Sequence, residues 1–378
     1  MTTTLQEKQG YKKTELGWIP EDWEVVKLQN LYDFQYGKFN NNPDNGGEYP
    51  VYGANGIIGG YTEYNAEYST IIGHMGAYAG SVLWESGKHF VTYNGTIAKP
   101  KDKNIFSDRF GYFILLSLNI LKTCSGSGQP FLSYDTLNQI KVSVPSFIKE
   151  QQKIAEILST LDAKIEKNEK QIEQMEQLKK ALMQELLTNG IGHTEFKDTE
   201  IGKVPASWQV LPFIELMILQ RGYDLPVQNR LVGLYPLVAS NGVIDYHCDF
   251  KVKGPGVVTG RSGTLGKIHF VEKNYWPLNT TLYVKETYDN YPKFLYYFLQ
   301  NFRIEKHGTG TGVPTLNRNI VHDILIAKPL IPEQQKIAEI LSSADEKIEI
   351  LQNKKSEYER LKKGLMQKLL TGQIRVRV

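Results

Sequence analysis

Residues 150–159 read Glu-Gln-Gln-Lys-Ile-Ala-Glu-Ile-Leu-Ser, and residues 333–342 repeat the same ten residues 183 positions later. The likeness continues downstream, where Leu178-Lys179-Lys180, Leu182-Met183-Gln184 and Leu186-Leu187-Thr188 recur as Leu361-Lys362-Lys363, Leu365-Met366-Gln367 and Leu369-Leu370-Thr371. A match of this length does not arise by chance, and a repeat of this kind decides the architecture before single elements are assigned. The chain is therefore a tandem duplication.

The regions that precede the two copies also match each other, more loosely and at shifts of 184 to 187 residues. The matched stretches are Thr14–Gly17 with Pro20 and Trp23 against Thr199–Gly202 with Pro205 and Trp208, Asn55-Gly56 against Asn241-Gly242, and Gly126–Pro130 against Gly310–Pro314. Gly73-His74-Met75-Gly76 with Gly80 matches Gly260-Arg261-Ser262-Gly263 with Gly266, with one residue deleted between the last two glycines. The pattern predicts one fold that occurs twice with different surface residues.

Each identical decapeptide begins a heptad pattern, in which apolar residues recur at alternating steps of three and four. The two seams are Ile154, Leu158, Leu161, Ile165, Ile172, Met175, Leu182 and Leu186, and Ile337, Leu341, Ala344, Ile348, Leu351, Tyr358, Leu365 and Leu369. Each pattern predicts a helix of about 37 residues and about 55 Å, and Gly190 and Gly372 stand where such helices end. We expect the seams to pack on each other, because a helix this long extends beyond its own domain; packing on that domain's core is the alternative.

A pseudo-twofold relation between the halves makes the two helices antiparallel and places the C-terminal tail beside the N-terminal domain. The sequence therefore predicts an α+β protein with two similar β-rich domains separated by two long antiparallel coiled-coil helices. The expected boundaries are a first domain at 1–148, a central helix at 149–189, a second domain at 190–331, a C-terminal helix at 332–371 and a tail at 372–378.

Composition limits the class of protein. Of 378 residues 41% are hydrophobic and 22% charged, which is typical of globular proteins. Two cysteines, Cys124 and Cys248, cannot form a disulfide framework, and no run of 18 apolar residues or secretory signal is present. We expect a soluble, cytoplasmic protein. A net charge of +3, with 12 basic against 14 acidic residues in 1–148 and 15 against 12 in 188–331, predicts that neither domain holds a polyanion unaided.

Most catalytic and cofactor motifs fail on inspection. Gly260–Lys267 resembles a phosphate-binding loop, but its glycines are one residue too far apart and Ile268 stands where Ser or Thr must bind magnesium. Gly308–Gly312 lacks the last glycine of a dinucleotide turn, and no His-Glu-x-x-His or paired Cys-x-x-Cys occurs. No Pro-Pro is present, which excludes the catalytic loop of adenine methyltransferases. What remains is the glycine loop with His74 in one copy and Arg261 in the other, either a nucleic-acid contact or a tight strand connection.

Taken together, the duplicated helices and glycine-punctuated domains resemble the specificity subunit of type I restriction-modification systems over nearly the whole chain. The residues that carry the resemblance are Glu15–Pro20 with Trp23, Gly202–Pro205 with Trp208, the helix start Pro332–Ala338 and Leu369–Gly372. The first copy departs from the pattern, since it has Lys149 where the second has Pro332 and Asn189 where the second has Gly372.

The resemblance implies a non-catalytic reader of double-stranded DNA, in which each domain is a target recognition domain for one half of a bipartite, asymmetric site. It also implies two docked modification subunits that use S-adenosylmethionine to methylate adenine at N6, and restriction subunits that use ATP and magnesium; this chain itself is expected to hold no metal or cofactor. The candidate DNA contacts are Asn55, His74, Asn94 and Gln129, and Asn241, Arg261, Lys267, Asn279 and Thr311. The residues expected between the helices and at the docked partners are Ile154, Leu158, Leu161, Ile165, Ile337, Leu341, Ile348 and Leu351.

Without the resemblance, the residues leave other function classes open. A coiled-coil adaptor that joins other proteins without reading DNA shares the duplication and the long helices, but it does not need two divergent, loop-rich domains of equal size. A nucleotide-using enzyme needs an intact phosphate loop, and in that case Lys267 is essential for turnover. The target sequence and its spacer cannot be read from the chain.

Overall fold

The computed structural model describes residues 9–39, 43–125, 128–309 and 314–377. The chain forms two compact units, Met1–Glu169 with Asn353–Val378 (unit 1) and Lys170–Gln352 (unit 2). The long helices α4 (Ile148–Leu186) and α8 (Ile331–Leu369) are each divided between the units, with one part in unit 1 and the other part in unit 2. The sequence-based boundaries gave each helix a segment of its own, whereas each part of a helix groups with the globular region whose core it completes.

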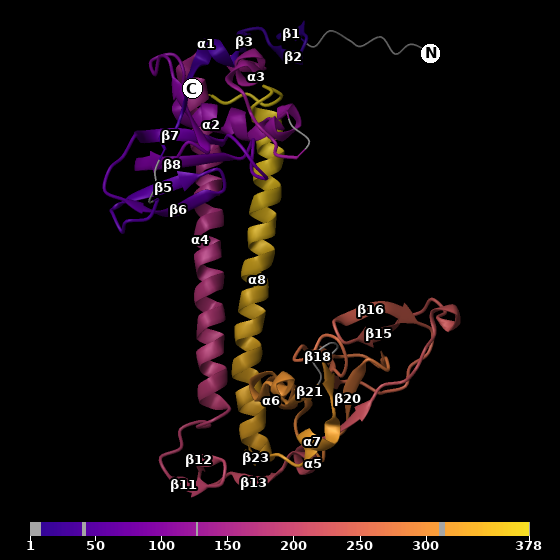
Figure 1. Cartoon of the computed structure of the whole chain (residues 1–378). Helices are drawn as coiled ribbons and strands as arrows, with labels where there is room; N and C mark the ends of the chain where they lie inside the picture. Colours follow the sequence, from indigo (N-terminus) through magenta and orange to yellow (C-terminus); the bar gives the residue numbers. More distant parts are fainter. Residues whose placement is uncertain (1–8, 40–42, 126–127, 310–313, 378) are drawn as a thin grey trace. The chain divides into compact units, whose positions relative to one another are not determined.

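The globular region of unit 1 is an α+β arrangement of short elements (Figure 1). Its elements are β1 (Tyr11–Thr14), β2 (Gly17–Pro20), β3 (Trp23–Lys27), α1 (Leu28–Leu31), β4 (Tyr32–Tyr36), β5 (Tyr49–Gly53), β6 (Gly56–Tyr61), β7 (Ala66–Gly73), β8 (Val82–Val91), β9 (Gly95–Pro100), α2 (Asp108–Ser117), η1 (Ile120–Thr123), α3 (Tyr134–Gln139) and β10 (Lys141–Pro145). One six-stranded sheet has the order β4-β9-β7-β8-β5-β6, and β3 pairs with β10. Within this sheet β5 runs parallel to β8, and the other pairs are antiparallel.

The globular region of unit 2 repeats this order with one interruption. Its elements are β11 (Phe196–Thr199), β12 (Gly202–Pro205), β13 (Gln209–Pro212), α5 (Phe213–Leu216), β14 (Ile218–Arg221), η2 (Val227–Asn229), β15 (Tyr235–Ala239), β16 (Gly242–His247), β17 (Gly256–Gly260), β18 (Ile268–Val271), β19 (Trp276–Pro277), β20 (Thr281–Glu286), α6 (Pro292–Phe302), η3 (Ile304–His307), β21 (Gly308–Thr309), β22 (Thr315–Leu316), α7 (Arg318–His322) and β23 (Leu325–Lys328). The strand orders β14-β20-β17-β18 and β16-β15-β19 match the single sheet of unit 1, except that β18 and β19 replace the continuous β8. The predicted internal repeat of the fold is confirmed.

In each unit, one part of α4 packs antiparallel to one part of α8. In unit 1, Lys362 Nζ lies 2.5 Å from Asp162 Oδ1 and Lys355 Nζ lies 2.8 Å from Glu169 Oε1. Unit 2 exchanges the roles of the helices, since Lys179 of α4 lies 2.5 Å from Asp345 of α8. Because the numbers rise along α4 as they fall along α8, the predicted antiparallel pairing is confirmed.

The repeated Glu-Gln at each helix start has a structural role, which is to fasten the helix to its globular region. Gln151 Nε2 donates to the Pro145 carbonyl at 2.9 Å, and Gln334 Nε2 donates to the Pro329 carbonyl at 3.0 Å. The preceding glutamates accept from buried tryptophans: Trp23 Nε1 donates to Glu150 at 3.3 Å and Trp208 Nε1 donates to Glu333 at 2.9 Å. Identical residues in the two copies therefore make identical contacts.

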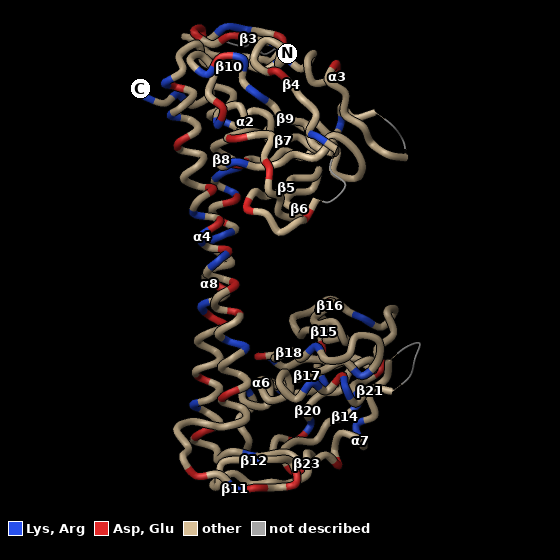
Figure 2. Tube along the Cα trace, turned by 60° about the vertical axis from the view of Figure 1, so that its left-hand side comes forward, with Lys and Arg blue, Asp and Glu red and all other residues tan. Residues whose placement is uncertain are grey.

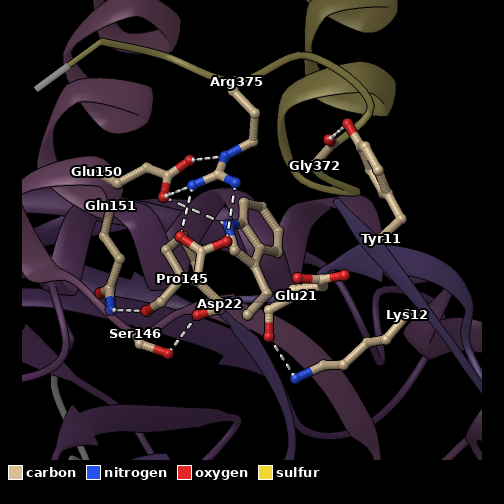
Figure 3. A network of polar contacts seen from close by, with 11 residues as sticks. Tyr11, Lys12, Glu21, Asp22, Pro145, Ser146, Glu150, Gln151, Gly372 and Arg375 are labelled. Carbon is tan, nitrogen blue, oxygen red and sulfur yellow. Dashed lines mark hydrogen bonds and ion pairs between the residues drawn. The ribbon is translucent and has the colours of Figure 1, made fainter. Parts of the chain in front are cut away.

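The residues that follow each helix close onto these same glutamates. In unit 2, His193 Nε2 lies 2.8 Å from Glu333 Oε1. In unit 1 the C-terminal tail takes this place, because Arg375 bonds both Glu150 and Asp22, and Tyr11 donates to the Gly372 carbonyl (Figure 3). The tail thus lies against the N-terminal strands of its own unit.

Two hydrophobic clusters hold the helix starts. Ile154 and Leu158 are fully buried in the cluster of unit 1, with Trp23 and Phe110 of the globular region and Leu369 of α8. Ile337 and Leu341 are fully buried in the cluster of unit 2. The first turns of each seam therefore pack on the domain core as well as on the other helix, so both packing modes considered for the seam are present in the structure.

Candidate nucleic-acid interface

Four loops of unit 1 that carry the predicted DNA contacts are tied together. The His74 amide donates to the Asn94 carbonyl at 2.8 Å, which joins the loop after β7 to the β8–β9 turn. The Leu132 amide donates to the His74 carbonyl at 2.9 Å, which adds the segment before α3. Ser81 Oγ donates to the carbonyl of Ala54 in the β5–β6 turn at 2.5 Å. Residues 36–39 join them, because the Gly37 amide donates to the Gly95 carbonyl at 2.9 Å. We refer to residues 36–39, 54–55, 74–81, 92–94 and 128–132 as loop surface 1.

Unit 2 builds the same arrangement from its own loops. The Arg261 amide donates to the Thr280 carbonyl at 2.8 Å, and the Leu316 amide donates to the Arg261 carbonyl at 2.8 Å. A β-carbon on Gly260 would lie 3.2 Å from the Ser240 side chain, which places the β15–β16 turn next to the loop after β17. Residues 221–224 join them, because the Gly222 amide donates to the Thr281 carbonyl at 3.0 Å. We refer to residues 221–224, 240–241, 261–267, 278–280 and 314–316 as loop surface 2.

The main-chain hydrogen bonds confirm that His74 and Arg261 are equivalent, as the repeat predicted. In each unit the amide of this residue donates to the turn before β9 or β20, and its carbonyl accepts from the segment before α3 or α7. The glycines also agree. Gly76 and Gly263 have φ values of +82° and +81°, and Gly80 and Gly266 have +82° and +78°, a region that favours glycine. The loop between them is one residue shorter in unit 2, as the matched sequences indicate.

The structure leaves most predicted contact residues on the loop surfaces. Asn55, Gln129, Asn241 and Lys267 are exposed, and Asn94, Arg261 and Asn279 are partly exposed. Thr311 lies outside the described residues. Asn279 Nδ2 donates to Asp224 Oδ1, which orients its amide. Their contact with DNA stays a prediction.

His74 is the exception, because its side chain is 5% exposed. Its ring lies 4.0 Å from the Tyr36 ring and 4.6 Å from the Phe131 ring, centroid to centroid. Burial lowers the pKa of His74, so the ring is held neutral, and burial raises the pKa of Tyr36 and of Tyr134, the latter to about 12. In this conformation the His74 side chain supports the loop from beneath residues that lie far away in sequence, and its contact with DNA stays a prediction.

Sequence reasoning missed several exposed residues of these surfaces. Phe39 and Tyr93 form a ring pair with centroids 5.9 Å apart, and Arg221 occupies the end of β14. The repeat could have pointed to these residues, but the sequences of residues 37–48 and 222–234 are too different to be aligned. The equivalence of Phe39 with Asp224 follows only from the main-chain hydrogen bonds of the residues beside them.

The residues predicted to lie between the helices and at docked partners are mostly buried. Ile154, Leu158, Ile337 and Leu341 have no exposed surface, so they stabilise the fold, and docking of a partner beside them stays a prediction. The remaining predicted residues are Leu161, Ile348 and Leu351, which are buried, and Ile165, which is partly exposed. Acidic and basic residues are interspersed along α4 and α8 (Figure 2). The large apolar residues that these helices expose are Leu178, Ile340, Ile350 and Leu361.

Within the described residues, no group of three or more His, Cys, Asp or Glu side chains is arranged to hold a metal ion. Lys267 is exposed, and the following Ile268 is buried at the start of β18, so the hydroxyl that a phosphate-binding loop needs for magnesium is absent there. None of the helices in the described ranges has the length and hydrophobicity required to cross a bilayer.

Comparisons with known proteins agree with this geometry. The model of the type I restriction modification DNA specificity domain matches residues 20–177 and again residues 208–360. The type I restriction enzyme MjaVIII specificity subunit of Methanocaldococcus jannaschii is 29% identical over 408 residues, covering 95% of this chain and 94% of that protein. The putative MjaX specificity subunit of the same organism is 27% identical over 430 residues, covering 98% of each.

A solved structure shows the same fold. The crystal structure of a type I restriction-modification S subunit from M. genitalium covers 98% of this chain and 99% of its own, with a TM-score of 0.72 and 18% sequence identity. The two matches of the domain model fall on the two copies that the repeat and the loop surfaces define. The chain therefore belongs to the family of type I restriction modification DNA specificity domains, of which it carries two copies.

Proposed function

We propose that this chain is the DNA-reading specificity subunit of a type I restriction-modification complex, and that each unit reads one half of a bipartite, asymmetric target in double-stranded DNA. The observation that carries the proposal is that one loop framework occurs twice, held by equivalent hydrogen bonds, with different side chains on each copy. A shared framework with different surfaces is what two dissimilar half-sites require, since base edges are read by side chains and not by the framework.

The catalytic chemistry is proposed to lie on partner subunits. Two modification subunits, docked on the paired helices, would bring S-adenosylmethionine and methylate adenine at N6, and restriction subunits would bring ATP and magnesium. The failed phosphate-loop pattern at Gly260–Lys267 supports a chain without catalytic activity of its own. A net charge of only +3 supports partners that share the phosphate contacts. The free Cys124 and Cys248 favour a cytoplasmic setting.

Co-expression with the modification subunit, followed by genome-wide mapping of methylated adenines, tests the proposal. We expect a split motif with two dissimilar halves. Exchange of residues 199–331 for the corresponding region of a relative should change one half and leave the other half unchanged. A continuous motif, or a change in both halves, would refute two independent readers.

The same experiment separates the adaptor hypothesis from the proposal. A coiled-coil adaptor that does not read DNA predicts that methylation sites depend on the modification subunit alone. In that case exchange of residues 199–331 would leave the motif unchanged as long as the complex assembles.

A further inference from the structure

Main-chain hydrogen bonds establish which residues of the two units occupy equivalent places beyond the matched motifs. In unit 1 the Gly37 amide donates to the Gly95 carbonyl at 2.9 Å, and in unit 2 the Gly222 amide donates to the Thr281 carbonyl at 3.0 Å. The next residues bond in the same way, Lys38 to Val91 and Tyr223 to Pro277. The equivalent pairs that follow are Tyr36 with Arg221, Phe39 with Asp224, and Tyr93 with Asn279.

The first difference lies at the outer edge of the loop surfaces. In unit 1 this place holds Phe39 and Tyr93, which are 71% and 45% exposed and whose ring centroids are 5.9 Å apart. In unit 2 it holds Asp224 and Asn279, joined by a hydrogen bond from Asn279 Nδ2. An apolar pair in one copy is thus replaced by a polar pair in the other, with the two members in contact in both.

The second difference lies at the centre of the surfaces. In unit 1, Tyr36 stacks on Tyr134 with centroids 3.9 Å apart, and Phe131 covers His74 and is itself exposed. In unit 2 the place of Tyr36 is taken by Arg221, whose side chain is 51% exposed, and the place of His74 by Arg261.

The two units also differ in side-chain type at two further equivalent places. Phe131 pairs with Met75 in an isolated bridge in unit 1, where unit 2 pairs Thr315 with Ser262. Ser81, which follows Gly80, corresponds to the exposed Lys267, which follows Gly266. Loop surface 1 therefore presents the exposed rings of Phe39, Tyr93 and Phe131. At the equivalent places loop surface 2 has no ring, and it carries Arg221 at the end of β14 and Arg261 directly after β17.

We propose that the two halves of the target are read by different chemistry: unit 1 contacts thymine methyl groups through Phe39 and Tyr93, and unit 2 contacts guanine through Arg221 and Arg261. Apolar side chains in the major groove select thymine by its C5-methyl group, and arginine selects guanine by its O6 and N7 acceptors. Aromatic rings carry no charge with which to bind a phosphate, whereas two arginines on a rigid loop framework suit a base edge that presents two acceptors.

The inference rests on the proposed function, and base analogues in the DNA test it with the unmodified protein. The probe is the complex of the full chain with its modification subunits, bound to a duplex that carries the mapped target. Replacing thymine by uracil in the half read by unit 1 removes one methyl group and should weaken binding about fourfold for each contacted thymine. Replacing guanine by 7-deazaguanine in the half read by unit 2 removes N7 and should weaken binding by about 5- to 150-fold. The same two replacements in the opposite halves should have no effect.

Protein variants connect each effect to its residues. F39A/Y93A should abolish the uracil effect in one half, and R261A and R221A should reduce the 7-deazaguanine effect in the other and broaden the methylation motif at a guanine. The matched controls are Ile105→Ala, an exposed apolar residue beyond the far end of β9, and Lys285→Ala, an exposed cation toward the far end of β20. Both controls should keep the wild-type motif and both analogue effects.

The outcomes separate the two proposals. A wild-type complex that yields no split motif overturns the proposed function. A split motif whose first half contains no thymine or whose second half contains no guanine overturns only the present inference, and so does full binding to both analogue duplexes. If a variant fails to assemble with its partners, the analogue effects measured with the wild-type protein still decide the question.

Discussion

Replacing Arg375 with alanine should destabilise unit 1 because it removes the charge that balances a buried carboxylate. Arg375 Nε and Nη2 donate to Glu150 at 2.7 and 2.9 Å, and its Nη1 and Nη2 donate to Asp22 at 2.8 and 2.7 Å (Figure 3). Glu150 is 2% exposed, and its contact with Trp23 Nε1 at 3.3 Å is long. The two carboxylates raise the pKa of Arg375, and Arg375 lowers the pKa of Asp22.

The magnitude follows from burial. Removing one partner of a buried ion pair costs about 3–5 kcal/mol of unfolding free energy. The Arg375 side chain is 40% exposed, so water screens part of the interaction, and we expect a loss of about 2–3 kcal/mol. For a unit of this size that corresponds to a decrease in Tm of about 4–12 °C.

Differential scanning calorimetry of the full chain measures this loss as a shift of the unit 1 transition. Arg377→Ala, which removes an exposed arginine two residues further along the tail, is the matched control and should leave Tm unchanged. Adding Glu150→Gln to Arg375→Ala should recover part of the loss, because glutamine removes the unbalanced charge and keeps an acceptor for Trp23. Equal Tm values for the Arg375 and Arg377 variants, or a further decrease on adding Glu150→Gln, would refute the reasoning.

Three further substitutions test the packing of the units. Gln334→Ala should lower the unfolding free energy of unit 2 by about 2–4 kcal/mol, because Gln334 is fully buried and its loss leaves the Pro329 carbonyl and the Tyr291 amide without their partner. Chemical denaturation measures this loss, with Gln373→Ala at an exposed site as the control. Gly372→Ala should destabilise unit 1 by at least about 1 kcal/mol, because the φ of Gly372 is +69° and an added β-carbon would collide with Pro20. Thermal unfolding measures the loss, with Gly364→Ala at an open helical site as the control. An equal loss of stability in both variants would contradict the prediction. Burial lowers the pKa of His322 from its ordinary value near 6.5. The unfolded chain therefore takes up a proton at this histidine at a higher pH than the folded chain does. The stability that neutral His322 contributes is present above about pH 6.5 and is lost as the pH falls. Thermal unfolding of unit 2 should therefore show a smaller decrease between pH 7.5 and 5.5 in His322→Asn than in the wild type.

Local patterns in the sequence predicted the parts of the fold that depend on local physics. The heptad spacing after each decapeptide predicts a long helix with one apolar stripe, because the period of the pattern and the period of the helix are both properties of neighbouring residues. Gly190 and Gly372 end the helices with φ values of +71° and +69°, which a glycine just past a helix predicts. The pairing of His74 with Arg261 came from the repeat and holds in the structure.

Local patterns do not predict which residues are buried, because burial depends on what packs against a residue from elsewhere in the chain. A histidine in a glycine loop looks exposed by its neighbours, but Tyr36 and Phe131 cover His74. Ile154 and Ile337 look like helix-seam residues that a partner could contact, but they are enclosed in the cores of their units. A heptad pattern predicts that a residue is buried, but it does not predict which part of the protein packs against that residue.

By itself the sequence determined that the chain is a duplication, where its two long helices run, that they pair antiparallel, and which glycine loops correspond. Only the tertiary structure decided which side chains lie together on each loop surface, that Phe39 meets Tyr93 where Asp224 meets Asn279, and that the tail bonds Glu150. The physical reason is range: repeats, heptads and caps are set within a few turns of chain, whereas the register of strands and the closure of loops bring together residues tens to hundreds of positions apart, and that pairing has no local signature.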